Sequence, residues 1–247
     1  MSLLHIDTSL ANSNNKVDTN IFKVDGNPFD LVYTFRIPRR DIKSFTLASA
    51  EIPIGFYNIR APFNTCTIET QGTPYTFSIP EGYYPGISDI VAALNNYTVT
   101  NPVGNALGTF FVNGSLIGFN CSNDPVIFTT KSGNQPNVLA MIGFYDGQYI
   151  DGNGYATIPF RITFDTYIVI YLPFIAGSSS EPSNITFKVP VNTADQIFYT
   201  EATSFTQTIA NVTSSSPFRT LKIQVFDRFG NLLNNNGLDW SLTLKIQ

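Results

Sequence analysis

The sequence predicts an all-β protein: an antiparallel eight-stranded single jelly-roll sandwich with a mixed insertion that carries one or two short helices. Two long tracts patterned as strands, at residues 31–58 and 221–246, bracket the chain. In the closing tract the apolar positions recur at every second residue, which is the period of a half-buried strand, and they are Trp240, Leu242, Leu244 and Ile246. No helical pattern separates the closing strands, which favours an antiparallel sandwich over a doubly wound sheet.

The first part of the chain is predicted to be an extended N-terminal arm, over residues 1–28. This segment is rich in Asn, Asp and Ser, and its apolar residues form only short islands such as Ile21-Phe22. Such an arm is expected to become ordered against a neighbouring chain. The jelly-roll domain is then expected to begin at residues 29–63, with strands at residues 31–37 and 42–52 joined by a turn at Pro38.

Residues 64–154 are predicted to form an insertion subdomain, because short strand patterns, many glycines and the helical signals of the chain occur there. A helix is expected from residue 87, with Ser88 as its cap and Asn95 and Asn96 at its end. A second short helix is expected at residues 136–142, with Pro136 at its first position and Gly143 after its last. Strands are expected at 107–112, 116–120 and 126–130, with Asn113-Gly114 as a hairpin turn.

The chain returns to the jelly-roll domain at residues 155–247. Strands are expected at residues 159–172, 184–189, 196–210, 218–226 and 238–246. The first of these is apolar on nearly both faces at its end, which predicts a central strand covered from both sides. With the two opening strands these make seven, and the eighth strand of a jelly roll is expected from residues 65–70 or 75–79.

The composition is poor in charge. The chain has 14 Lys+Arg and 18 Asp+Glu, and charged residues make up only 13% of its 247 residues, about half the usual share. No basic cluster indicates direct binding of nucleic acid. We also expect no transmembrane segment and no passage through the signal-peptide route, because neither pattern occurs. Cys66 and Cys121 are expected to be thiols.

The sequence predicts no catalytic residues, no metal ligands and no cofactor-binding residues. The only histidine, His5, lies in the predicted arm, so a catalytic triad and a multi-histidine metal site are disfavoured. Carboxylates for a glycosidase show neither a recurring spacing nor a flanking aromatic platform. The segment 146–154 lacks the ligand spacing of a calcium loop, and no phosphate-binding loop occurs. We therefore expect that the protein is not an enzyme and uses no cofactor.

The chain is rich in aromatic residues, with 21 Phe and 12 Tyr. Five tyrosines of the insertion lie in Gly-rich loops, where such a ring can anchor a protein interface, stack on a sugar or pack over its own domain. These candidates for interaction are Tyr83, Tyr84, Tyr145, Tyr149 and Tyr155. Ile21 and Phe22 of the predicted arm are two further candidates, because an arm contacts its neighbours through its apolar islands.

Five segments carry a resemblance to a known family. Residues 44–59 (SFTLASAEIPIGFYNI) resemble small jelly-roll capsid proteins of virophages and large icosahedral double-stranded DNA viruses, of the penton or minor capsid class. The resemblance continues, in the same order along the chain, through residues 77–95, 139–144, 225–233 and 237–246. Together these segments contain 60 of the 247 residues, spread from residue 44 to residue 246.

This resemblance implies a structural virion protein, most simply a penton protein that forms homopentamers at icosahedral five-fold vertices. It implies contacts with the major capsid protein and other minor capsid proteins, assembly inside the host cell and a final location in the virion. The insertion is expected to project from the sandwich. Three alternatives stay open at this point: a minor capsid protein that cements capsomers, a receptor- or glycan-binding head of a spike, and a carbohydrate-active enzyme.

Overall fold

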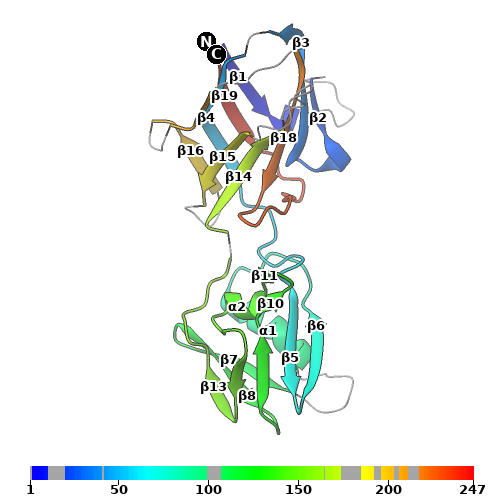
Figure 1. The fold of residues 1–247 in the computed structure, drawn as a ribbon, viewed down its shortest axis with the longest axis vertical. Helices are drawn as coiled ribbons and strands as arrows, with labels where there is room; N and C mark the ends of the chain where they lie inside the picture. Colours follow the sequence, from blue (N-terminus) through cyan, green and yellow to red (C-terminus); the bar gives the residue numbers. More distant parts are fainter. Residues whose placement is uncertain are drawn as a thin grey trace. The chain divides into compact units, whose positions relative to one another are not determined.

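The chain divides into two compact units in the computed structural model (Figure 1). Unit 1 comprises Met1–Phe56 and Asp165–Gln247, and unit 2 comprises Tyr57–Phe164. The residues described are 2–10, 20–40, 42–98, 107–163, 165–173, 185–191, 196–202, 206–210 and 217–247. Unit 2 begins before and ends after the insertion predicted at residues 64–154.

Unit 1 contains two antiparallel sheets (Figure 1). The first has the order β1 (Ser2–Asp7), β19 (Ser241–Ile246), β4 (Ser44–Pro53) and β16 (Gln196–Thr200), with β17 (Thr208–Ala210) also paired with β4. The second has the order β15 (Ile185–Pro190), β14 (Tyr167–Leu172), β18 (Phe218–Phe226), β3 (Asp30–Arg39) and β2 (Ile21–Lys23). Short 3-10 helices follow β1 and β2, at Thr8–Leu10 and Val24–Gly26.

This strand order is that of a jelly roll. Along the chain the first sheet receives β1, β4, β16 and β19, and the second receives β3, β14, β15 and β18. Each five-stranded sheet therefore holds four jelly-roll strands, because β17 continues the line of β16 along β4 and β2 is an additional edge strand. The predicted fold class, an eight-stranded antiparallel jelly roll, is confirmed for unit 1.

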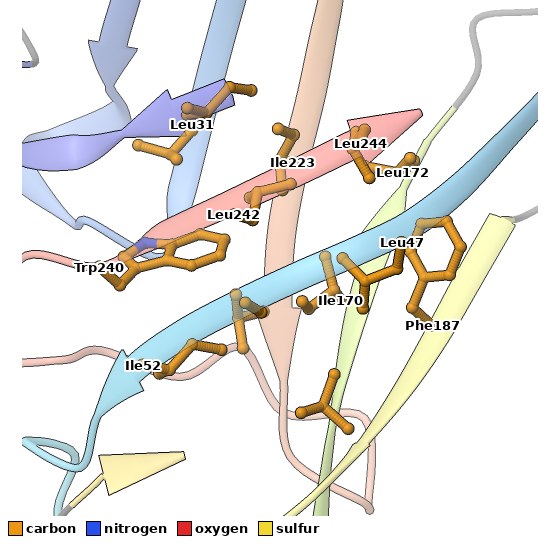
Figure 2. Close-up of a cluster of buried hydrophobic side chains, with 14 of the residues drawn as sticks. Leu31, Leu47, Ile52, Ile170, Leu172, Phe187, Ile223, Trp240, Leu242 and Leu244 are labelled. Atoms are coloured by element: carbon orange, nitrogen blue, oxygen red, sulfur yellow. The ribbon is translucent and has the colours of Figure 1, made fainter. Parts of the chain in front are cut away.

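The core of unit 1 consists of apolar side chains that alternate with polar ones along the strands. In β19, Leu242, Leu244 and Ile246 are buried, and the polar residues between them are partly exposed. Figure 2 shows Leu242 and Leu244 in one buried cluster with Ile170 and Ile223, which come from strands of the other sheet. The core is therefore the layer between the two sheets, as in other β-sandwiches.

The N-terminal arm predicted for residues 1–28 is wrong for residues 2–10 and 20–28, and residues 1 and 11–19 lie outside the described residues. Residues 2–7 form β1, which pairs with β19 along its whole length, from Ser2 with Ile246 onward. Leu4 and Ile6 are buried in the core, so the missing eighth strand is β1. The segments expected to supply it, 65–70 and 75–79, belong to unit 2. Leu4 and Ile6, two alternating apolar residues in a polar segment, are only a weak sequence signal for a strand. This segment forms a strand because it pairs with β19.

The strand expected at residues 159–172 is shorter and less covered than predicted. It begins at Tyr167 and lies between β15 and β18, so its place inside the sheet is confirmed. Its coverage from both sides is wrong, because only Ile168, Ile170 and Leu172 are buried. On the other face Tyr171 packs against Phe226 at 5.6 Å between ring centroids. The strand expected at 196–210 is split into β16 and β17.

The described residues of unit 2 form two small sheets, a two-stranded hairpin and two α-helices (Figure 1). One sheet has the order β12 (Gln148–Ile150), β9 (Val126–Thr129), β5 (Thr65–Thr70) and β6 (Thr73–Ser78), and the other has the order β13 (Asn153–Tyr155), β8 (Leu116–Cys121) and β7 (Gly108–Asn113). The helices are α1 (Ile87–Thr98) and α2 (Val138–Met141), and β10 (Lys131–Ser132) pairs with β11 (Gln135–Pro136).

Phenylalanines form the centre of unit 2. Phe110 and Phe119 lie 4.7 Å apart between ring centroids, and Phe128 and Phe144 lie 4.6 Å apart. Such edge-to-face aromatic pairs add to the free energy of burial. Both small sheets contribute to this cluster, since β7 and β8 carry the first pair and β9 carries Phe128. The result is a core of its own for the insertion.

Most local signals of unit 2 are confirmed, but the ends predicted for the first helix are wrong. Ser88 lies inside α1 instead of capping it, and α1 continues past Asn95 and Asn96 to Thr98. Helix α1 buries Ile90, Val91 and Leu94 on one side, and the Asn113-Gly114 turn joins β7 to β8, with Gly114 at a φ of 60°. The start predicted for the second helix is wrong. Asn137 caps α2, because its side chain accepts a hydrogen bond from the Leu139 N–H at 3.0 Å. Pro136 instead lies in β11, one residue before the cap.

Candidate interaction surface

The five candidate tyrosines fall in two places in unit 2. At the first, Tyr83 is exposed, whereas Tyr84 is bound into the fold. The Tyr84 hydroxyl donates to the Pro80 carbonyl at 2.8 Å, and its backbone N–H donates to Asn58 Oδ1 at 2.8 Å. Burial, followed by the proximity of Tyr97, raises the pKa of the Tyr84 hydroxyl. Tyr84 therefore has a structural role, and Tyr83 is the residue that a partner can reach.

Asn58 joins the two ends of unit 2. Its Nδ2 donates to the carbonyls of Tyr84 at 2.8 Å and Ile162 at 2.7 Å, and its Oδ1 accepts from the Tyr84 N–H. The Asn58 side chain is buried, and its three hydrogen bonds to partly exposed Tyr84 and Ile162 are part-buried. Asn58 thus holds the entering segment, the loop before α1 and the leaving segment in one place.

We expect Asn58→Ala to lower the free energy of unfolding of unit 2 by about 3 kcal/mol, because it leaves three part-buried backbone groups without their partner. Hydrogen exchange of the β7 and β8 amides, followed peptide by peptide, measures this change. Asn123→Ala is the control, since Asn123 is exposed in the same unit. Equal exchange rates in the two variants would show that Asn58 does not secure unit 2.

The second place gathers Tyr145, Tyr149 and Tyr155 around one buried glutamine. Gln148 Oε1 accepts from the Tyr145 N–H at 3.2 Å, and its Nε2 donates to the Tyr155 carbonyl at 2.8 Å. All three tyrosines are exposed, and Tyr149 faces outward because its strand neighbours, Gln148 and Ile150, are buried. Gln148 could not be predicted as a functional residue from sequence, since a glutamine between loop residues gives no signal of burial.

The turn before β12 is fixed by a carboxylate. Asp146 Oδ1 accepts from the Thr130 N–H at 2.9 Å, and Oδ2 lies 3.4 Å from Lys131 Nζ. The Thr130 N–H, and secondarily Lys131, hold the pKa of Asp146 below its ordinary value.

Across the described parts of the chain, no group of three or more His, Cys, Asp or Glu residues is placed to hold a metal ion.

The outward side of the sheet β13-β8-β7 is a second feature of this region, and we call it the Tyr155 face. Tyr155, Gly118 and Phe111 are directly paired across the three strands. A Cβ at position 118 would overlap the Phe111 ring, so this ring covers the glycine. The Phe111 and Tyr155 rings lie edge to face, with centroids 5.7 Å apart. The outward residues are Thr109, Phe111, Asn113, Leu116, Gly118, Asn120, Asn153 and Tyr155.

The two candidate interaction residues of unit 1, Ile21 and Phe22, lie on opposite sides of β2. Ile21 is only 2% exposed and belongs to the core, so its selection as an interaction residue is wrong. Pairing of β2 with β3 turns Ile21 inward and leaves Phe22, opposite Val32, exposed on the other side of the sheet. Phe22 alone remains available to a partner.

The remaining reactive residues have ordinary surroundings. His5 lies on β1, outside any arm, and its Nδ1 is 3.0 Å from Thr243 Oγ1. Cys66 and Cys121 are both free thiols, and burial raises the pKa of Cys66. Neither α1 nor α2, the α-helices of the described residues, is long and apolar enough to cross a membrane.

The strand order of unit 1 places the chain among single jelly-roll proteins. A search of solved structures finds similarity to the mavirus penton protein, with 12% identity and a TM-score of 0.48 over 100% of this chain and 99% of that one. At this identity the likeness concerns the fold alone. No family model and no curated protein matches the chain.

Proposed function

We propose that this chain is a structural virion protein, the penton protein that closes icosahedral vertices as a homopentamer. The observation that carries the proposal is the jelly roll of unit 1, together with the place of the resembling segments on it. Residues 44–59 contain β4, and residues 225–233 and 237–246 contain the end of β18 and all of β19. These strands come from both sheets. A jelly roll alone hosts many functions, so the segments are needed as well as the fold.

The edges of the first sheet suit a ring. A closed ring joins one flank of each copy to a different flank of the next. The sheet ends at β1 on one side and at β16 on the other. Each end carries an exposed apolar side chain on its outward face, Leu3 at 68% and Phe198 at 54% exposed. Two unlike edges with apolar residues favour a head-to-tail contact over a two-fold one.

In the virion, the proposed ring meets the major capsid protein and other minor capsid proteins, and it is assembled inside the host cell. The low charge of the chain supports contacts made mainly by neutral and aromatic side chains. Phe22 and Tyr83, exposed on unit 1 and unit 2 respectively, are the candidates for such contacts.

Light scattering of the purified chain tests the proposal. We expect a species of five times the 27.3 kDa chain mass that increases with concentration. Phe198→Asp is expected to shift it to monomer, because a charge in an apolar contact costs several kcal/mol. Ile37→Asp is the control, since Ile37 is also exposed but lies on β3 of the other sheet. A monomer at every concentration would contradict a self-closing ring, and a trimer would favour a spike head.

A further inference from the structure

We propose that the Tyr155 face of unit 2 binds a neutral carbohydrate of one or two pyranose rings. The face is the outward side of β13, β8 and β7, and it combines an aromatic pair with side-chain amides. The inference stands on unit 2 alone, so it holds or fails independently of the pentamer proposed above.

The aromatic part of the face is fixed in place. Phe111 lies over Gly118, where no side chain competes with it, and Tyr155 of β13 packs edge to face against it across β8. Tyr155 is 44% exposed, so a large part of its ring is open to solvent. Its backbone is also held, because its carbonyl accepts a hydrogen bond from Gln148 Nε2 at 2.8 Å. A rigid aromatic residue of this kind provides contact area at low cost in entropy.

Polar groups lie one step along the same strands. Asn153 pairs with Asn120, and Asn120 pairs with Thr109, so two amides and a hydroxyl form a row beside the row of Tyr155, Gly118 and Phe111. Rows on one face of a sheet are about 6.7 Å apart, which is roughly the span of a sugar ring and its hydroxyl. Asn120 and Asn153 are exposed, and among the described residues their side chains have no hydrogen-bond partner.

The charge and size of the face decide which ligand suits it. None of its eight outward residues is Asp, Glu, Lys, Arg or His, so an ionic ligand has no counter-charge there. A stable protein interface takes about 20–30 residues from each side, far more than this face supplies. A neutral sugar fits both limits, since its C–H face contacts an aromatic ring and its hydroxyl groups donate to and accept from amides.

Saturation-transfer NMR on the full chain tests the inference, with cellobiose, lactose, mannobiose and chitobiose as probes and a sulfated heparin disaccharide as the charged comparison. We expect at least one neutral disaccharide to bind with a dissociation constant of about 0.1–10 mM. Tyr155→Ala is expected to weaken that binding at least about tenfold. Asn153→Ala, an exposed change that leaves the rings in place, is expected to weaken it about fivefold.

Tyr149→Ala is the matched control, because Tyr149 is also an exposed tyrosine but lies on the other sheet of unit 2. It is expected to leave binding unchanged. The inference is overturned if none of the neutral probes binds, if only the sulfated probe binds, or if Tyr155→Ala and Asn153→Ala bind as the parent chain does. A change of oligomeric mass in Tyr155→Ala without sugar would also overturn it, since a second copy would then cover the face.

Discussion

Deletion of residues 1–28 is expected to unfold unit 1. The segment contains β1, which forms one end of the sheet β1-β19-β4-β16, and β2, which pairs with β3 in the other sheet. Its loss exposes the core from both sides. A dispensable arm, as the composition of this segment suggests, would instead leave the stability of unit 1 unchanged, so the experiment separates the two descriptions.

The expected size of this effect follows from burial. Leu4, Ile6 and Ile21 are all buried in the core of unit 1, and burying one such side chain stabilises a fold by about 1.5–3 kcal/mol. The deletion also removes Thr8, which exchanges two hydrogen bonds with the backbone of Trp240. The total is comparable with the whole stability of a domain, about 5–15 kcal/mol.

Tryptophan fluorescence measures the outcome selectively, because Trp240 is the only tryptophan and belongs to unit 1. We expect the truncated chain to show the emission of an exposed indole and no cooperative transition on heating. Two point variants of the full chain serve as controls within β1. Ile6→Ala is expected to lower the melting temperature, whereas Leu3→Ala, on the exposed face, leaves it nearly unchanged. A truncated chain that melts like the full one would refute the role of β1.

Strands with long alternation were predictable from sequence. The expected strand at 218–226 has the bounds of β18, and the buried set of β19 is the set that alternation selected. In both, the periodicity of side chains is sufficient, because one face must be buried. In β1 only Leu4 and Ile6 mark the buried face, and a strand this short is stabilised by its pairing with β19. Pairing over more than 230 residues of separation is not visible in local composition.

The candidate surface was predictable only in its residue types. Tyrosines in Gly-rich loops indicated that unit 2 presents aromatic rings, and four of the five are exposed. The partners of those rings depend on strand register: Phe111 reaches Tyr155 only because both pair with Gly118. The role of Gln148 was also not predictable. Its side chain binds the backbone of Tyr145 and of Tyr155, and these hydrogen bonds are not visible in the sequence.

The second large effect is expected from Trp240→Ala, which should lower the free energy of unfolding of unit 1 by about 3–5 kcal/mol. Trp240 immediately precedes β19 and is 3% exposed. Its ring packs edge to face on Phe29 at 5.6 Å between centroids, and its Nε1 donates to the Pro28 carbonyl. Truncation leaves a cavity between the sheets and a buried carbonyl without its donor, and both effects destabilise the fold.

Urea unfolding followed by circular dichroism measures this loss, since the variant has no tryptophan fluorescence. Trp240→Phe separates the two contributions: it keeps an aromatic ring in the core but removes the Nε1 donor, so a loss of about 1–2 kcal/mol is expected. Leu232→Ala is the control for an exposed apolar residue of unit 1. If Trp240→Ala unfolds at the same urea concentration as the parent, the layer between the sheets is not what stabilises unit 1. A loss confined to Trp240→Ala would instead make the ring, rather than its hydrogen bond, the main contribution of this residue.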